Sequence, residues 1–201
     1  MARTTELSQA KTSRSPRHCA AAPTAPAPAP RDRVGAARLG DIAAVFNLIQ
    51  LGAASGHFND LYLRPRYQAG LGLQLFSAWL WGRVRVPGGL WRRAQLQVLR
   101  VDKDFAGFAL ILGTDPAAGL YEIYMTSLAP AFRAQGWGRR MLLAALDGLP
   151  ARCTVQADSL PAAAVMKQLL RSLGFRPATR PLAGARAEVA QRFTLDRRAG
   201  E

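Results

Sequence analysis

Histidine and cysteine are scarce in this chain of 201 residues, which contains two of each. His18 and His57 are too few for a zinc site built on histidine. Cys19 and Cys153 are too few for a disulfide framework, and they fit a reducing compartment. With an apolar share of 49%, we expect an ordinary hydrophobic core in place of metal or disulfide cross-links.

Long hydrophobic runs are absent as well. The longest, 71–81, is broken by Gly72, Gln74 and Ser77 and is shorter than the roughly 18–20 residues that span a bilayer. The N-terminus lacks the apolar segment of a secretory signal, although its Arg, Ser and Ala content is similar to that of an organellar transit peptide. We expect a cytoplasmic protein that does not associate with membranes.

Acidic residues are also few, 13 against 27 lysines and arginines, so the formal net charge is +14. Residues 1–33 carry six cationic and two acidic side chains, which leaves about +10 on the rest of the chain. This charge favours an acidic partner: a polyanionic cofactor, a nucleic acid or an anionic surface. A preference for arginine codons is the alternative explanation.

Composition divides the chain into two parts. Residues 1–33 are rich in Ala, Pro, Ser and Arg, and the Ala/Pro alternation of 23–30 favours an extended chain that buries too little surface to fold. Residues 34–197 contain periodic apolar segments and are expected to form one domain.

The periodicity of that domain predicts a mixed α/β class, with helices covering a sheet. Helices are expected at 42–53 with Asp41 as cap, from just after Pro65 to 81, at 138–146, and from a cap at Asp158 or Ser159, through Pro161 in its first turn, to Gly174. Strands are expected at 34–39, 96–101, 105–112, 120–128, 152–157, 175–176 and 188–195.

The most informative segment, 132–142, reads Phe-Arg-Ala-Gln-Gly-Trp-Gly-Arg-Arg-Met-Leu and lies between an expected strand and an expected helix. Gly136 and Gly138 permit a tight turn and a close approach of backbone N–H groups to an anion. The helix start adds unbonded amides and a positive dipole end, and Arg133, Arg139 and Arg140 add charge. We interpret the segment as a diphosphate-binding loop; the alternative is a helix-initiating turn with surface arginines.

Two better-known phosphate-binding motifs do not fit this loop. It is not a P-loop, because no Gly-Lys-Ser/Thr follows. A dinucleotide-binding fingerprint would require a third glycine and an acidic residue about twenty positions on, and both are missing.

In its context, the segment resembles the signature of the GCN5-related N-acetyltransferase (GNAT) family. That family carries Arg/Gln-x-x-Gly-x-Gly/Ala after its fourth strand, and Arg133-Ala-Gln-Gly-Trp-Gly138 matches it. The preceding Ser127-Leu-Ala-Pro130 and the downstream Leu173-Gly-Phe175 are similar to the family as well. The resemblance covers about 34–195 and is strongest from 120 to 145.

The resemblance implies a GNAT-like fold, with a mostly antiparallel central sheet flanked by helices, and an N-acetyltransferase that uses acetyl-CoA. Backbone N–H groups of 135–140 would hold the pyrophosphate, and main-chain groups around Leu128 would pair with the pantetheine arm as an added strand does. The thioester would lie where the strand at 120–128 diverges from the strand at 152–157. The cofactor-binding residues would therefore be Leu128, Arg133, Ala134, Gln135, Gly136, Trp137, Gly138, Arg139 and Arg140.

Direct transfer also requires a group that removes a proton from the amine. Glu122 falls where the histone-acetylating branch of the family has its glutamate. Tyr124 lies two residues on, on the same face of the expected strand, and would orient the amine or carry a proton. A solvent-facing Glu122 and a core Tyr124 are the alternatives.

The chain departs from the family at the group that protonates the leaving thiolate. Leu170 stands where many members have a tyrosine, and Ala163 replaces an asparagine. Cys153 is interpreted as a buried structural cysteine, with acetylation as the alternative. His57 lies between the first two helices, where acceptor specificity is often set in this family.

The expected activity is transfer of acetyl from acetyl-CoA to a primary amine, which could belong to a small molecule, a protein or an aminoacyl-tRNA. A homodimer is one possible assembly. The substitutions at 163 and 170 also allow a non-catalytic acyl-CoA-binding regulatory module. A nucleic-acid-binding domain without a cofactor is the third reading, although no helix-turn-helix, zinc-finger or RNA-recognition signature is present.

Overall fold

The computed structural model describes residues 31–86, 88–178 and 191–197. Most of the expected tail, with His18 and Cys19, lies outside the described residues, as do 188–190 of the last expected strand. The strands are β1 (Asp32–Ala36), β2 (Arg83–Arg85), β3 (Trp91–Val101), β4 (Asp104–Asp115), β5 (Leu120–Leu128), β6 (Thr154–Ser159), β7 (Arg176–Pro177) and β8 (Gln191–Asp196). The helices are α1 (Asp41–Ala54), α2 (Pro65–Trp81), α3 (Trp137–Asp147) and α4 (Ala164–Ser172), with short 3₁₀ turns η1 (Asp60–Leu63) and η2 (Pro130–Phe132).

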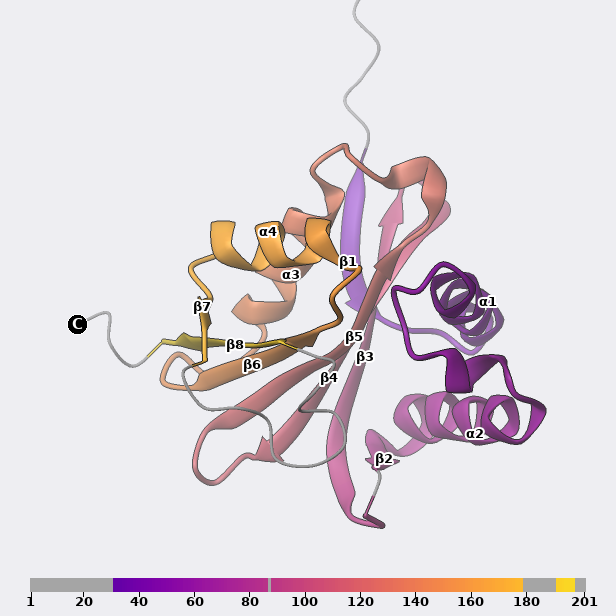
Figure 1. The fold of residues 1–201 in the computed structure, drawn as a ribbon, viewed down its shortest axis with the longest axis horizontal. Helices are drawn as coiled ribbons and strands as arrows, with labels where there is room; N and C mark the ends of the chain where they lie inside the picture. The colour runs from indigo at the N-terminus through magenta and orange to yellow at the C-terminus, as the bar shows by residue number, and fades with distance from the viewer. Residues whose placement is uncertain (1–30, 87, 179–190, 198–201) are drawn as a thin grey trace, which may run out of the picture.

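The strands form one sheet in the order β1-β3-β4-β5-β6-β8-β7, with β2 paired to β3. Only β5 and β6 run parallel; the other neighbouring strands of the described chain are antiparallel. In Figure 1, α1 and α2 lie against one face of this sheet, and α3 and α4 lie against the other. The expected mixed α/β class with a mostly antiparallel sheet is confirmed.

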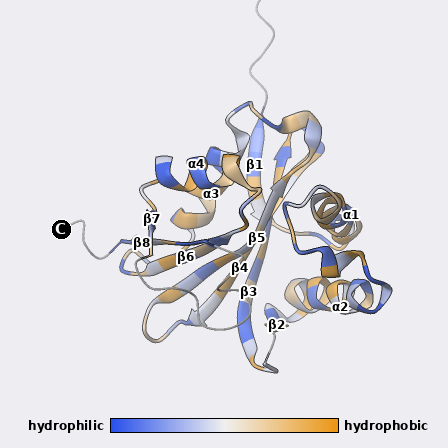
Figure 2. Cartoon of the chain, in the orientation of Figure 1, coloured by the Kyte–Doolittle hydropathy of each residue, from blue (hydrophilic) through white to orange (hydrophobic). Residues whose placement is uncertain are grey.

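Each face of the sheet carries its own hydrophobic core. The core under α1 and α2 is built around Leu75, Val98 and Phe108, which are fully buried. The core under α3 and α4 is built around Leu170 and Phe193, also fully buried. Figure 2 shows blue and orange residues alternating around α4, as expected for a helix that buries only one side.

Local sequence sets the limits of α2. Pro65 stands in its first turn, where a missing N–H has no consequence. At the other end Gly82 adopts φ 59°, and its N–H donates to the Ala78 carbonyl at 3.1 Å. A left-handed glycine closes a helix in this way at little steric cost. No helix in the described residues is long and apolar enough to cross a membrane.

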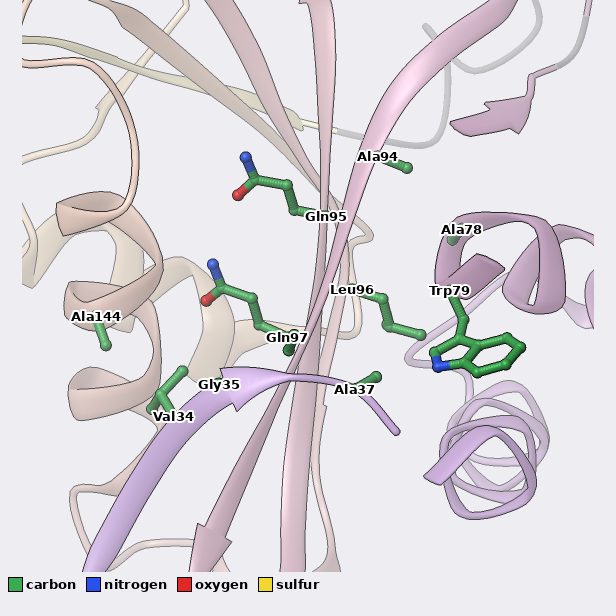
Figure 3. A pocket seen from close by; sticks show the side chains of 11 residues that line it. Val34, Gly35, Ala37, Ala78, Trp79, Ala94, Gln95, Leu96, Gln97 and Ala144 are labelled. Atoms are coloured by element: carbon green, nitrogen blue, oxygen red, sulfur yellow. The ribbon is translucent and has the colours of Figure 1, made fainter. Parts of the chain in front are cut away.

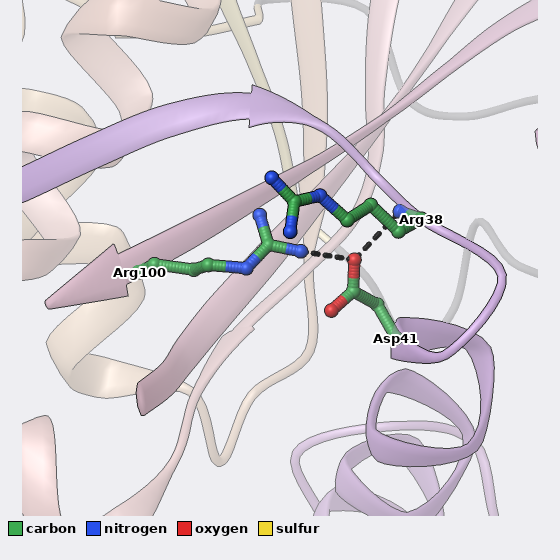
Figure 4. Close-up of polar contacts among 3 residues, drawn as sticks. All are labelled: Arg38, Asp41 and Arg100. Atoms are coloured by element: carbon green, nitrogen blue, oxygen red, sulfur yellow. Dashed lines mark hydrogen bonds and ion pairs between the residues drawn. The ribbon is translucent and has the colours of Figure 1, made fainter. Parts of the chain in front are cut away.

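The expectation that Asp41 caps α1 is wrong in detail, because Asp41 is the first residue of the helix and Gly40 occupies the cap position. Its carboxylate points backwards, where it accepts a hydrogen bond from the Arg38 N–H at 2.6 Å and pairs with the Arg100 guanidinium (Figure 4). A carboxylate in the first turn also suits the positive end of the helix dipole. The pair therefore attaches the start of α1 to β3.

The expected cap of α4 is also wrong. Both Asp158 and Ser159 belong to β6, and the helix begins at Ala164, after Pro161, without a side-chain cap. The physical reason is pairing with β8, which extends β6 to Ser159. The Asp158 carboxylate is occupied by the Arg192 guanidinium, at 2.8 and 3.0 Å, and cannot accept helix amides.

A split between the parallel strands β5 and β6 shapes the middle of the sheet. They are paired only over 120–123 and 154–157, and beyond Ile123 and Ala157 the pairing ends. β6 continues alongside β8, while β5 continues alongside β4. Among the described residues, the side of β5 that faces β6 therefore has no strand partner over 125–128.

A bulge in β5 lies at the same point. Leu110 of β4 stands opposite Met125, but the next residue, Ile111, stands opposite Ile123. Tyr124 is consequently the extra residue, and such bulges bend a strand and redirect its side chains. The bulge and the end of the β5–β6 pairing therefore both lie just after Ile123, the residue that follows Glu122.

Candidate active site

The loop after β5 presents unbonded main-chain amides. Ala134 and Gly136 adopt φ values of 59° and 82°, which turn the chain sharply between η2 and α3. In the described part of the chain, the six consecutive amides of 134–139 donate to no protein acceptor. The Arg140 amide, which was expected to bind the anion, instead donates to the Gly136 carbonyl at 3.2 Å as the first helical hydrogen bond.

The space above this loop is open. A side chain built on Gly136 would meet no protein atom within 4 Å. The loop residues from Arg133 to Gly136 are exposed, and Gly138 is half-buried against Leu128 and Leu169. Free amides under open space at a helix start form a cradle for an anion.

Trp137 anchors the cradle from below. Its side chain is 6% exposed and packs in a small core with Leu99 and Met141. The indole N–H donates to the Gln135 side-chain oxygen at 3.2 Å, and the Gln135 side-chain Nε2 donates to the Ala131 carbonyl at 2.7 Å. Trp137 and Gln135 therefore hold the shape of the loop through their side chains.

The three flanking arginines tie the cradle to its surroundings. Arg133 Nε donates to the Leu128 carbonyl at 3.0 Å. Arg139 donates to the carbonyl and hydroxyl oxygens of Ser172 at 3.0 and 3.2 Å, and so links α3 to the end of α4. Arg140 pairs with Asp32 at 2.9 Å and lies over the Trp137 ring. They surround the loop with positive charge while also bracing it.

The two expected catalytic side chains share one face of β5. Glu122 is half-buried and stands opposite Leu112, a member of the core under α1 and α2. Tyr124 packs against the same core. Both side chains therefore lie on the α1/α2 face of the sheet, where β5 and β6 separate.

A charged pair lies on the neighbouring strands, near Glu122. Asp158 of β6 and Arg192 of β8 form a bidentate, half-buried ion pair. The hydrogen bond that Arg192 donates to Asp158 raises the pKa of Arg192 above its usual value, while burial lowers it; the charges of Asp158 and Glu122 raise it further. Glu122 and this ion pair thus form a group of two carboxylates and one permanent cation.

Comparison with known proteins identifies the fold. A scan of protein-family models and a search of curated proteins find no match. Among solved structures, a GNAT-family protein from Desulfovibrio desulfuricans superposes with a TM-score of 0.60 at 19% identity, over 84% of this chain and 99% of that one. The chain has the GNAT fold.

Two other solved structures with the GNAT fold contain ligands. The protein yncA from Salmonella typhimurium, solved with acetyl-CoA, has a TM-score of 0.58 at 17% identity, over 83% of this chain and 94% of that one. Spermidine N-acetyltransferase from Vibrio cholerae, solved with CoA and spermine, has a TM-score of 0.53 at 12% identity, over 83% of this chain and 95% of that one.

At the position where many GNAT sequences have a tyrosine, this chain buries Leu170 completely in the core under α4. Cys153 is buried in the same core and is free, as a structural cysteine would be. His57 is exposed in the turn after α1, with its ring nitrogen 2.9 Å from the Ser55 hydroxyl.

Sequence reasoning missed Ser159. Its side chain is 3% exposed, and its hydroxyl has no hydrogen-bond partner among the described residues. It lies two residues beyond Ala157, where pairing with β5 ends. The sequence analysis assigned Ser159 to a helix cap instead of a strand. The sequence feature that could have predicted its burial is its spacing, since it follows the buried Val155 and Ala157 at every second position of the strand.

A separate hollow of about 360 Å³ opens at the far edge of the sheet, between β1 and β3 (Figure 3). Its walls are the main chain of β1 and side chains that include Trp79, Gln95, Gln97 and Ala144. They contain no carboxylate, imidazole or thiol, so this hollow has no acid–base group for the expected reaction.

Proposed function

We propose that the protein is an N-acetyltransferase that uses acetyl-CoA and passes the acetyl group directly to a primary amine. Among the described residues, the observation that carries this proposal is the row of six unbonded amides at 134–139, which follows the part of β5, 125–128, that has no strand partner on its β6 side. Between Glu122 and Leu128 the strand extends roughly 20 Å, which gives an extended arm a continuous main-chain edge to follow.

The described residues fit this cofactor. The amides of 134–139 suit a diphosphate, because main-chain donors at a helix start bind anions. The β6-facing side of 125–128, which pairs with no described strand, suits an amide-containing arm, which would bind as an added strand does. Acetyl-CoA would supply the acetyl thioester in this site.

On the α1/α2 face, Glu122 is proposed as the base that accepts a proton from the attacking amine. Its carboxylate stands at the split, near the Asp158–Arg192 pair. Two carboxylates there also favour a cationic acceptor before it loses its proton. Tyr124 is proposed to position the amine from the bulge.

Ser159 is proposed to donate a hydrogen bond to the leaving thiolate, which then takes up its proton from water. Its buried hydroxyl has no hydrogen-bond partner among the described residues and lies on the α3/α4 face of β6, at the end of the paired region. This assignment replaces the tyrosine that is absent at position 170.

A non-catalytic acyl-CoA-binding module is the second candidate, favoured by the burial of Leu170 and Ala163. CoA binding and thiol release, measured together, distinguish the two functions. Calorimetry that detects CoA binding, together with no release of free thiol across a panel of primary amines, would establish the module and exclude the transferase.

Gly136→Glu tests the cradle. The open space above position 136 lets the side chain point outward, but its charge would repel a diphosphate. We expect calorimetry to show at least a 100-fold loss of CoA affinity. A glutamate at φ 82° also lowers the free energy of unfolding by about 1–3 kcal/mol.

Gly88→Glu is the matched control for this strain. Gly88 has φ 93° and an equally open environment, but it lies in the β2–β3 connection. We expect it to lose similar stability and to keep CoA binding. Equal affinities for the two variants would contradict the proposed cradle.

Glu122→Gln tests the base. Loss of a general base lowers kcat by about 100-fold or more. Acetyl-CoA affinity should stay within twofold, because the amides of 134–139 are unchanged. Glu122→Asp should recover part of the rate, and a Gln variant with wild-type kcat would remove Glu122 from the reaction.

A further inference from the structure

Acidic residues are absent from one long stretch of the chain. Residues 61–101 contain seven arginines and no aspartate or glutamate. This stretch forms α2, β2 and β3, with the 3₁₀ turn before them. Three of the chain's four tryptophans also lie here, at 79, 81 and 91.

The β2–β3 hairpin collects these cations on one surface. Arg83 stands directly opposite Arg93, and Arg85 stands opposite Trp91. All four side chains are exposed. Within 31–86, 88–178 and 191–197, none of these three arginines takes part in an ion pair. Like charges opposite one another destabilise a strand pair, so the hairpin gains stability when an anion binds there.

Two exposed tryptophans stand beside the arginines. Trp81 and Trp91 are 60% and 58% exposed. Together with Arg83 they line a hollow of about 460 Å³. Phe76 supports the Trp81 ring edge-on, with centroids 6.3 Å apart. The hollow therefore combines two exposed indole rings with a guanidinium group.

The charge and shape of this surface decide among its partners. A second copy of the chain would bring arginines against arginines, which is unfavourable. An anionic membrane would satisfy the charge without requiring a slot between aromatic rings. A nucleotide satisfies both features, because its base stacks on indole and its phosphate pairs with arginine.

We propose that the hollow lined by Trp81, Arg83 and Trp91, with the adjoining Arg85 and Arg93, binds a segment of single-stranded nucleic acid. A base enters between the indole rings, and the neighbouring phosphates lie on the arginines. Unpaired bases are required, because a duplex keeps its base faces stacked.

This surface is distinct from the amide cradle of 134–139. Arg93 of β3 stands opposite Gly113 of β4, which stands opposite Tyr121 near the start of β5. The amide cradle follows the other end of β5, and Figure 1 shows β2 at the opposite end of the sheet. RNA binding here can therefore be measured independently of CoA binding.

The test is fluorescence anisotropy with a labelled 12-nucleotide oligo-uridine RNA and the full chain. We expect Trp81→Ala and Trp91→Ala each to weaken binding about tenfold, the scale of one lost stacking contact. Leu73→Ala, which trims an exposed α2 side chain, is the control and should bind like the wild type. Quenching of tryptophan fluorescence by the RNA should diminish in both Trp variants.

Salt dependence tests the arginines. For single strands, each neutralised phosphate contributes about 0.7 to the slope of log Kd against log salt. Arg93→Glu should reduce this slope by about that amount, whereas Arg176→Glu, an exposed arginine on β7, should leave it unchanged.

Four results would overturn the proposal. They are wild-type RNA affinity in both Trp variants, equal affinity for a 12-base-pair duplex, a slope unaffected at Arg93, or binding to phosphatidylglycerol vesicles in the absence of RNA binding. Circular dichroism of each variant establishes that it is folded.

Discussion

Ser159 has an unusual combination of burial and chemistry at the scale of single residues. A buried hydroxyl without a partner loses its hydration and gains no hydrogen bond, which destabilises a fold by about 1–3 kcal/mol. Proteins retain such groups where they serve a reaction. The position of Ser159 at the end of the β5–β6 pairing fits that explanation.

Opposite effects of Ser159→Ala on stability and on rate follow from this interpretation. Removal of the hydroxyl should raise the free energy of unfolding by about 1 kcal/mol in chemical denaturation. It should lower kcat at least tenfold, because the developing thiolate loses a hydrogen bond that stabilises its charge. Ser159→Cys should restore part of the rate. A variant that is less stable and fully active would contradict the role.

Individual residues differ in how well the sequence predicted them. Gly136 and Gly138 were identified because a turn before a helix requires glycine, and Gly136 does adopt φ 82°. Glu122 and Tyr124 were correctly assigned to one face of β5. Ser159 was assigned to a helix cap, because serine before proline has the same local pattern in a cap and at a strand end.

The limits of β5 and α2 show what can be predicted from the local sequence alone. The strand predicted at 120–128 has the bounds of β5, and the second predicted helix ends with α2 at Trp81. Their ends are set locally, by Pro130 after the strand and by Gly82 after the helix.

Elements whose limits depend on distant partners were predicted less well. β2 was missed, and β3 begins five residues before the expected strand, because 91–95 has no apolar alternation and is held by pairing with β2. The start of α4 was displaced because pairing with β8 prolongs β6. Such pairing joins residues far apart in the sequence, which no local pattern records.

Attachment of α1 to β3 depends on Asp41, and we expect Asp41→Ala to show this. The change leaves the Arg100 guanidinium, 18% exposed, and the Arg38 N–H without their acceptor. The free energy of unfolding should fall by about 2 kcal/mol in urea denaturation. Asp147→Ala removes an exposed carboxylate of α3 and should stay within about 0.5 kcal/mol of the wild type. Similar losses for both variants would show that the Asp41 pair adds no specific stability.

For the whole molecule, cofactor choice should be visible in thermal stability. A ligand at 100 times its Kd adds about 2.7 kcal/mol, which for a domain of this size raises Tm by roughly 5–10 °C. We expect acetyl-CoA to produce such a shift in differential scanning fluorimetry, because in the proposed site both the cradle and the β6-facing side of β5 would bind it. ATP and NAD lack the arm and should give a much smaller shift. Equal shifts for the three ligands would indicate nonspecific attraction to a chain of net charge +14.

The gap within the sheet has a further consequence for solubility. An outer strand with free amides invites pairing with another protein and thereby aggregation. The amides of 125–128 that face β6, which have no strand partner among the described residues, instead lie between two strands of the same sheet, β4 on one side and the diverging β6 on the other. Neighbouring strands need about 4.8 Å of separation and extended backbone on the incoming chain. A slim linear molecule enters such a gap more readily than a folded protein's strand, so the molecule keeps a hydrogen-bonding template that other proteins do not reach.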